Sequence, residues 1–424
     1  MKRIGSDLGG VGRPSRRQVL GYGASLLAMG LASSPALAQG GGLFQTASAE
    51  WQDRFDGASR STRMPDTSVA TLSERVVAST EMAIQDYRNI EARGGWTGVP
   101  NDSRLRLGMR HPNVVALRQR LVVSGDLDPS VGMSDTFDSF VEGGVRRFQA
   151  RHGLIVTGIV AEATLAALNV PADTRRHQLE RNLDRLRERV GSLAPRYVMV
   201  NIPAADIEAV EQGFVHSRHI GVVGKADRAS PVHTAQIVDI NFNPYWTVPA
   251  SIVKKDLIPK MQAEPDYLTK NRIRIYDQKG NELVPSHVDW HSDEATNYMF
   301  RQDPGDINSL GSVRINMPNR DAVYMHDTPA KNLFGENARF HSSGCVRVQN
   351  VRSLVEWLLK DNPEGWDRRR IDEAIRSGER IDAKLPKPIP TYWVYITAWG
   401  GADGIVQFRE DIYGQDGLDA VALR

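Results

Sequence analysis

The apolar positions along the chain follow two different periods, and the change falls near Pro195. Between residues 72 and 191, apolar side chains recur every three or four positions, which is the spacing of an amphipathic helix. After Pro195, apolar and polar residues alternate, as they do in a half-buried strand. The sequence therefore predicts a multidomain α+β chain whose first part is helical and whose second part is mostly β.

The helical part divides into a compact unit and two flanking segments. Residues 72–92 and 175–191 each have the apolar spacing of one long amphipathic helix. Between them, residues 104–170 carry apolar positions for three shorter helices, which predicts a small all-α domain. We expect the flanking helices to form a scaffold around this domain. The two predicted scaffold segments are 71–103 and 171–195.

The alternating segments of the second part predict the strands of one mostly β domain over residues 196–415, followed by a short tail, 416–424. The last strand segment is followed by a glycine-rich stretch, 400–404, and a further apolar run, so it predicts a hairpin. The predicted strands are 196–202, 234–240, 313–317, 322–326 and 393–399.

Residues 251–300 interrupt the alternation of the β domain. The segment 254–264 has the composition of a helix, and the remainder is polar and irregular. A long irregular insertion of this kind is usually functional, for example as a lid over a site. We expect it to bury little apolar surface of its own and to be partly mobile.

The N-terminus predicts an export signal. Basic residues precede an apolar stretch, 19–32, and Ala36-Leu37-Ala38 supplies the small residues of a cleavage site. The pair Arg16-Arg17 also fits a twin-arginine signal, while the Sec route stays open. An uncleaved membrane anchor is disfavoured, because an apolar run shorter than ~18 residues barely spans a bilayer. We therefore predict a signal peptide over 1–38, a flexible leader over 39–70 and a periplasmic location.

Composition and charge exclude two other classes of protein. The 424 residues are 41% hydrophobic and 25% charged, which is ordinary for a soluble globular chain. The formal net charge is +2, and loss of residues 1–38 removes five basic residues and one acidic residue, which leaves −2. The mature chain has no basic excess for nucleic acid, and we expect no membrane span after cleavage.

Cys345 is the sole cysteine, so the chain has no internal disulfide. It lies among Ser342, Ser343 and Gly344 and close to Arg347, whereas an inert buried cysteine would have apolar neighbours. Thiol-based acyl transfer requires a thiolate, a base and N–H donors for an oxyanion. Gly344 also lacks a side chain that would block an approaching carbonyl. These surroundings favour Cys345 as a nucleophile.

His326 is the candidate base. It ends the predicted strand 322–326, in which Ala322, Tyr324 and His326 face the same side. An imidazole can take the proton of a thiol and return it to a leaving amine. The alternative is a structural histidine bonded to a backbone carbonyl. The nearby Cys345 favours the catalytic interpretation.

These residues resemble the signature of the L,D-transpeptidase catalytic domain, in which a histidine is followed by Ser-x-Gly-Cys-x-Arg-x-x-Asn. His326 and residues 342–350 match it, although most members have a histidine where Ser343 stands. The Tyr-x-His-Asp-Thr-Pro run at 324–329 and the aromatic segment 243–249 resemble the larger multidomain subfamily.

A second resemblance lies in the helical part. Residues 144–168 are similar to the three-helix peptidoglycan-binding domain, so the resemblance implies that unit 104–170 binds peptidoglycan. The family usually has aspartate where Thr157 stands and glycine where Ala161 stands. A helical spacer without a ligand is the alternative.

The resemblance implies a role for each residue of the site. Cys345 is the nucleophile, His326 is the general base and acid, and the amides of Gly344 and Cys345 form the oxyanion hole. For Arg347, a structural pair with a carboxylate is an equal alternative. No metal and no organic cofactor is implied. The implied substrate-binding residues are Tyr324, Arg347, Ser343 and Trp246.

The implied reaction remakes a peptide bond in peptidoglycan. Cys345 attacks the carbonyl of the third residue of a tetrapeptide stem and expels the terminal D-alanine. The amine of a second stem then attacks the thioester, which gives a 3→3 cross-link. The implied partners are the donor and acceptor stems, with carbapenems as inhibitors. A lipoprotein lysine as acceptor would give an anchored lipoprotein, and water would make the enzyme a carboxypeptidase. A wall-binding protein with an inactive site is disfavoured by the presence of both Cys345 and His326.

Overall fold

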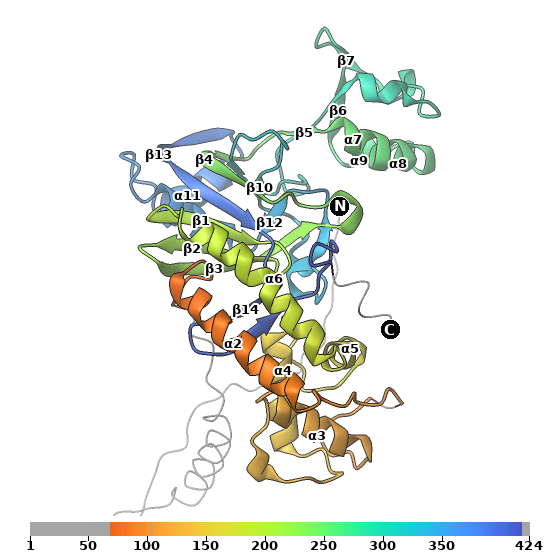
Figure 1. The fold of residues 1–424 in the computed structure, drawn as a ribbon. Helices are drawn as coiled ribbons and strands as arrows, with labels where there is room; N and C mark the ends of the chain where they lie inside the picture. The colour runs from red at the N-terminus through yellow and green to blue at the C-terminus, as the bar shows by residue number, and fades with distance from the viewer. Residues whose placement is uncertain (1–67, 103, 418–424) are drawn as a thin grey trace, which may run out of the picture. The chain divides into compact units, whose positions relative to one another are not determined.

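The computed structural model describes residues 68–102 and 104–417 (Figure 1). The predicted signal peptide and residues 39–67 of the predicted leader lie outside the described residues. The end of that leader is not flexible as predicted, because Val69 bridges Phe214 and Ala70 is fully buried. No helix within the described part of the chain is both long and apolar enough to cross a bilayer.

The helices before residue 195 lie where the apolar spacing predicted them. Ser73 caps the first helix by accepting a hydrogen bond from the Val76 amide, and Asp138 caps the third by accepting one from the Val141 amide. Pro171 immediately precedes the last helix, a position where its missing N–H costs nothing. The helices are α2 (Glu74–Ala92), α3 (Asn113–Val123), α4 (Ser139–Arg151), α5 (Glu162–Leu168) and α6 (Ala172–Val190).

Helices α3, α4 and α5 enclose a hydrophobic core of their own. Leu117, Leu121 and Phe148, which carried the helical period in the sequence, are fully buried in it. The loop before α5 is held by Gln149, whose side-chain oxygen accepts hydrogen bonds from the amides of Thr157 and Gly158 at 2.9 and 2.8 Å. The unusual Thr157 therefore takes part in a bond that shapes this loop.

The second part of the chain forms a nine-stranded sheet in the order β11-β3-β12-β10-β9-β4-β13-β1-β2. Because β2 also pairs with β3, the sheet closes on itself. The α+β fold class predicted from the two periods is confirmed. The strands are β1 (Arg196–Asn201), β2 (Asp206–Glu211), β3 (Phe214–Gly224), β4 (His233–Phe242), β9 (Val313–Asn316), β10 (Met325–His326), β11 (Phe340–Ser342), β12 (Val346–Val348) and β13 (Ile381–Val394).

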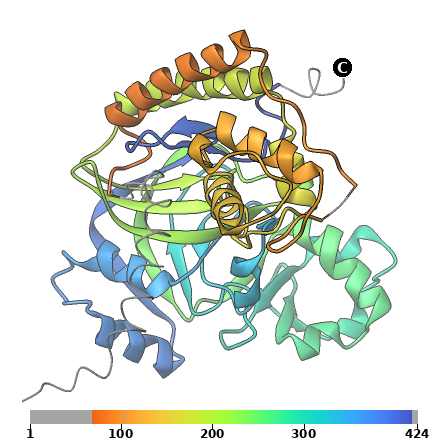
Figure 2. The ribbon, with the colours of Figure 1, turned by 90° about the horizontal axis from the view of Figure 1, so that it is seen from below.

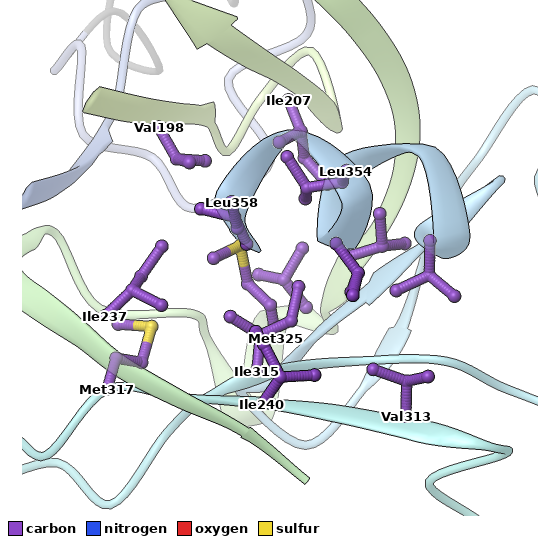
Figure 3. Packing of buried hydrophobic residues seen from close by; sticks show 14 of the residues in the cluster. Val198, Ile207, Ile237, Ile240, Val313, Ile315, Met317, Met325, Leu354 and Leu358 are labelled. Atoms are coloured by element: carbon purple, nitrogen blue, oxygen red, sulfur yellow. The ribbon is translucent and has the colours of Figure 1, made fainter. Parts of the chain in front are cut away.

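The two faces of this sheet pack against different helices. On β1, Val198 belongs to one buried cluster and Met199 to another, as expected when successive side chains point to opposite faces. The first cluster packs around helix α10 (Val351–Leu359), whose Leu354 and Leu358 point toward the strands (Figure 3). Helices α2 and α6 lie side by side over the second cluster (Figure 2).

Two strand predictions need correction. Strand β10 has only two residues, because Ala322 adopts a positive φ of 52° and the chain before Met325 forms a turn. The predicted strand 393–399 is divided: its start ends the long strand β13, and its end opens β14 (Ala398–Gly400). The predicted hairpin is confirmed, since β14 pairs with β15 (Val406–Phe408). Prolines hid β13 from the sequence pattern, and its register shifts between Lys384 and Ile389, where two of them lie.

The insertion is a small subdomain, and the expectation that it buries little apolar surface was wrong. Its four-stranded sheet has the order β5-β8-β6-β7, and side chains such as Leu257, Leu268 and Phe300 form a separate buried cluster. The predicted helix at 254–264 is present, and it begins with a π-helical turn at Val253–Leu257. The other elements are β5 (Trp246–Val248), α7 (Ala250–Ile252), α8 (Ile258–Ala263), α9 (Tyr267–Lys270), β6 (Ile273–Tyr276), β7 (Glu282–Leu283) and β8 (Met299–Gln302).

A buried ionic junction joins the three-helix unit to the β domain. Arg151 at the end of α4 makes two hydrogen bonds to Asp126, at 2.7 and 2.6 Å, and a third to the carbonyl of Val406 in β15. The ring of the adjacent His152 stacks between Phe148 and Phe408. The unit is therefore held against the hairpin by buried contacts as well as by the chain.

Candidate active site

A cavity of about 570 Å³ lies between the nine-stranded sheet and the insertion. Elements far apart in the sequence meet around it, because β10 and β12 are neighbours in the sheet and β5 leads into the insertion. Gly344 is buried and does not line the cavity. The other six predicted site residues line it: Cys345, His326, Tyr324, Arg347, Ser343 and Trp246.

The loop that presents Cys345 is held by hydrogen bonds within and around it. The Ser342 hydroxyl donates to the carbonyl of Cys345 at 2.5 Å and accepts from the Gly344 amide at 3.2 Å. The Ser230 hydroxyl donates to the Gly344 carbonyl at 2.7 Å. Gly344 has a φ of +113°, which few residues with a side chain adopt. Its amide is bonded within the loop, so the predicted oxyanion role would require that bond to be given up.

The Cys345 thiol is half-buried and bonded to Tyr324. Burial raises the pKa of the thiol to about 11, although hydrogen bonds from the Tyr324 amide and hydroxyl and the nearby Arg314 and Arg347 act in the opposite direction. The sulfur is therefore a neutral thiol near pH 7, and it needs a base before it can act as a nucleophile.

His326 lines the same cavity as Cys345 and is the candidate for that base. Its Nδ1 lies 2.5 Å from the carbonyl oxygen of Asp327, so Nδ1 carries a proton and Nε2 keeps its lone pair. Burial, and after it Arg347, lowers the pKa of His326 to about 3. The imidazole is thus neutral at physiological pH and able to accept a proton. His326 both bonds a backbone carbonyl and lines the cavity. A structural role and a catalytic role for this histidine are therefore compatible.

Asp327 anchors the turn that follows His326. Its carboxylate accepts hydrogen bonds from the amide and hydroxyl of Ser312, at 3.0 and 2.8 Å, and pairs with Lys331. These partners lower the pKa of Asp327 against the opposing effect of burial. A side chain at Gly311 would approach the carboxylate to 2.6 Å, so this position requires glycine. The contacts hold the carbonyl that orients His326.

Two aromatic residues complete one wall of the cavity. The ring of Tyr324 meets that of His326 edge-on, with 5.7 Å between centroids. The Trp246 indole, which comes from β5, forms a hydrogen bond with Tyr324. Burial raises the pKa of the Tyr324 hydroxyl, so this group remains a hydrogen-bond donor.

The equal alternative for Arg347, a pair with a carboxylate, is not present among the described residues. Its Nε lacks a hydrogen-bond partner there, and burial lowers the pKa of its guanidinium. Ser343 accepts a hydrogen bond from Arg228 at 3.0 Å, and Arg228 also pairs with Asp256 of the insertion. Arg228 thus links the insertion to the loop that carries Cys345.

Sequence reasoning missed Arg228, Asp256 and Arg314. The first two lie in segments without a periodic pattern, so no signal marked them. For Arg314 the sequence did contain a signal, because a cation stands between two apolar residues, Val313 and Ile315, in a predicted strand. Within the described part of the chain, no group of three or more His, Cys, Asp or Glu side chains is arranged to hold a metal ion.

Comparison with known families agrees with this arrangement. Residues 195–369 match the family model of the L,D-transpeptidase catalytic domain, and residues 110–168 match that of a "Putative peptidoglycan binding domain". A curated Haemophilus influenzae protein described as "Putative L,D-transpeptidase" is 36% identical over 220 residues, which is 52% of this chain. The match spans 44% of that relative, so less than half of its length is represented.

Solved structures of the same description are more distant. An L,D-transpeptidase from Xylanimonas cellulosilytica is 15% identical and has a TM-score of 0.22, with 70% of this chain and 99% of that chain covered. Another L,D-transpeptidase, solved in complex with imipenem, is 11% identical with a TM-score of 0.24, and the match covers 47% of this chain and 59% of that one. By its two family matches, the chain carries an L,D-transpeptidase catalytic domain over residues 195–369, preceded by a peptidoglycan-binding domain over residues 110–168.

Proposed function

We propose that this protein is a cysteine-dependent L,D-transpeptidase that forms 3→3 cross-links between peptidoglycan stems. The observation that carries the proposal is the pairing of Cys345 and His326 in one cavity, with the histidine tautomer fixed by the Asp327 carbonyl. This pair supplies a nucleophile and a base, and it needs neither a metal nor an organic cofactor.

The proposed reaction begins as Cys345 attacks the carbonyl of the third residue of a donor tetrapeptide. His326 Nε2 takes the thiol proton, and the carbonyl electron pair moves to oxygen. The intermediate collapses as the C–N bond breaks, and His326 gives the proton to the leaving amine of D-alanine. The acceptor amine then attacks the thioester and loses its proton to His326. The C–S bond breaks and Cys345 recovers that proton.

The Cys345 amide is the proposed oxyanion donor. The Gly344 amide joins it only if its bond to Ser342 is released. Tyr324, Arg347, Ser343 and Trp246 are the proposed substrate-binding residues, because they line the same cavity. Arg347 is a cation without a carboxylate partner among the described residues, which suits contact with an anionic stem.

The insertion is proposed to act as a lid over Cys345. Its Asp256 and Leu257 line the cavity, and Asp256 pairs with Arg228 beside the nucleophile loop. A closed lid would exclude water from the thioester and so favour an amine acceptor over hydrolysis. The unit 104–170 is proposed to hold peptidoglycan and raise the local concentration of stems. Export by the predicted signal would place the enzyme in the periplasm, where this substrate is found.

The reaction is tested by incubating the purified protein with disaccharide-tetrapeptide and identifying the products by mass spectrometry. We expect cross-linked dimers that have lost one D-alanine, and no product with Cys345→Ala. Tripeptide alone would show that water is the acceptor, and transfer to an added lysine peptide would favour lipoprotein anchoring. Product formation by Cys345→Ala would overturn the proposal, because the chain has no other thiol.

Carbapenems offer a second test of the same thiol. Their strained lactam carbonyl should take the place of the stem carbonyl and acylate Cys345 without release. Intact-protein mass spectrometry should show one adduct on the wild type and none on Cys345→Ala. An equal adduct on both proteins would mean that another residue reacts.

A further inference from the structure

The strand register places His326 between two arginines. Arg314 on β9 is the cross-strand partner of His326 on one side, and Arg347 on β12 is its partner on the other. Side chains at paired positions share a face of the sheet and lie close together. Both arginines are half-buried, and neither pairs with a carboxylate among the described residues. A row of two uncompensated cations therefore flanks the catalytic imidazole.

The guanidinium of Arg314 is held in one orientation. It lies 4.4 Å from the centroid of the Tyr324 ring, and its Nη2 donates to the side-chain oxygen of Asn316 at 3.0 Å. The amide group of Asn316 is itself fixed, because its nitrogen donates to Asp239 at 3.0 Å. Asn241 donates to the other oxygen of Asp239 at 2.7 Å. The hydrogen bonds from Arg314 to Asn316 and from Asn316 to Asp239 thus hold the Arg314 guanidinium over the Tyr324 ring.

Tyr324 is the link between Arg314 and the nucleophile. Its hydroxyl and amide are bonded to the Cys345 thiol, and its ring meets His326 edge-on. Stacking of Arg314 on one face limits the positions that the ring can take. The position of the hydroxyl next to the sulfur therefore depends on a residue that does not line the cavity.

An unpaired cation in this place has a cost and a benefit. Burial without a carboxylate is unfavourable for the fold. The same positive potential stabilises the negative charge that develops on the sulfur and the carbonyl oxygen during acylation. It also lowers the pKa of His326, so this residue titrates at a lower pH than a free histidine does.

We propose that Arg314 is a positioning residue of the active site, which holds Tyr324 against Cys345 and, with Arg347, supplies positive charge beside the sulfur that becomes negative during acylation. The proposal rests on the thiol chemistry of Cys345 and His326 described above. It adds a residue that neither the sequence motif nor the cavity lining includes.

The charged and titratable groups that face His326 can be named. Arg314 comes from β9 and Arg347 from β12. Tyr324 and Cys345 are hydrogen-bonded to each other. The last group is Asp327, whose carboxylate is bound by Ser312 and Lys331. Loss of Arg314 removes one of the two cations. The pKa of His326 should then rise, and the acid limb of the acylation profile should move to higher pH.

The test compares Arg314→Gln and Arg314→Lys with the wild type. The readouts are the second-order rate of imipenem acylation, followed by intact mass from about pH 2 to pH 9 so that the range includes the His326 pKa of about 3, and the thermal unfolding midpoint. We expect Arg314→Gln to slow acylation about tenfold or more and to move the acid limb upward, with an unfolding midpoint that is unchanged or raised. Arg314→Lys keeps the positive charge, so the acid limb of its acylation profile should lie at the same pH as that of the wild type.

Arg196→Gln is the matched control. Arg196 also stacks on an aromatic ring, 4.5 Å from the centroid of Trp357, but it pairs with Asp361 and lies outside the cavity. This control should lower the unfolding midpoint and leave acylation unchanged. The proposal is overturned if Arg314→Gln reacts within twofold of the wild type with the same acid limb. It is equally overturned if slower acylation comes with a loss of stability like that of the control and no change in pH dependence. Failure of the wild type to be acylated would instead refute the proposed function.

Discussion

The buried pair of Asp126 and Arg151 allows a quantitative prediction of stability. The two side chains are 4% and 7% exposed, and they share two hydrogen bonds. Arg120 and Arg175 lie nearby, and burial lowers their pKa values to about 9 and about 10, with Arg151 adding to the effect. Asp126→Ala would leave Arg151 as an uncompensated buried charge among these cations. Breaking a buried pair in this way costs about 3–5 kcal/mol.

The assay is thermal and urea unfolding of the full chain, followed by circular dichroism. A loss of about 3–5 kcal/mol corresponds to a fall in the unfolding midpoint on the order of 10 °C for a protein of this size. The double variant Asp126→Ala with Arg151→Met removes both charges, so it should recover most of the lost stability. Imipenem acylation at low temperature should persist in both variants, because neither residue lines the cavity.

Two results would refute the reasoning. A loss below about 1 kcal/mol for Asp126→Ala would mean that water or a rearranged side chain compensates Arg151. A double variant less stable than Asp126→Ala would mean that Arg151 stabilises the junction through contacts other than the pair. Its bond to the Val406 carbonyl and its place near the Phe148 ring are the contacts in question.

Three further predictions concern the site. The pKa of His326 is about 3 in the fold against about 6.5 for a free histidine, so the unfolded chain binds more protons between these two pH values. The wild type should therefore lose stability as the pH falls from about 6.5 to about 3, and His326→Gln should lose less over the same range. Alkylation of Cys345 by iodoacetamide should have a midpoint near pH 11 in the folded protein and near pH 9 in urea, and a folded midpoint at or below 9 would contradict the effect of burial. Replacing residues 251–300 with a Gly-Ser bridge should raise the ratio of hydrolysed to cross-linked product while acylation continues, and an unchanged ratio would show that the insertion is not a lid.

The sequence predicted those parts of the fold in which one period runs through a whole element. Leu117 and Leu121 lie on one face of a regular helix, so their spacing identified it. The part of strand β13 before residue 393 was missed because prolines argue against a strand, although a shift in register accommodates them here. The core of the insertion was missed for another reason: Leu257 comes from a helical turn and Phe300 from a strand, so no single period connects them.

For the site, the motif marked Cys345 and His326 because their residue types are tied to the chemistry, and both residues line one cavity. The sequence predicted the Gly344 amide as an oxyanion donor but did not indicate its hydrogen bond to Ser342, which depends on the local turn. Asn350, the last residue of the motif, directly precedes α10, but it has a φ of 50° and makes no side-chain capping bond. Arg228 and Arg314 act through contacts between distant strands and loops, which a linear pattern does not encode.

The protonated state of the resting thiol has a consequence for the lifetime of the enzyme. Peroxides and other oxidants react with thiolates, and export by the predicted signal would place the enzyme outside the reducing cytoplasm. With a pKa of about 11, only roughly one molecule in ten thousand carries a thiolate at pH 7. Cys345 has no second cysteine to trap a sulfenic acid as a disulfide. Burial next to Tyr324 therefore protects the thiol from oxidants, and in the proposed mechanism the sulfur becomes reactive only when His326 takes its proton in the presence of a substrate carbonyl.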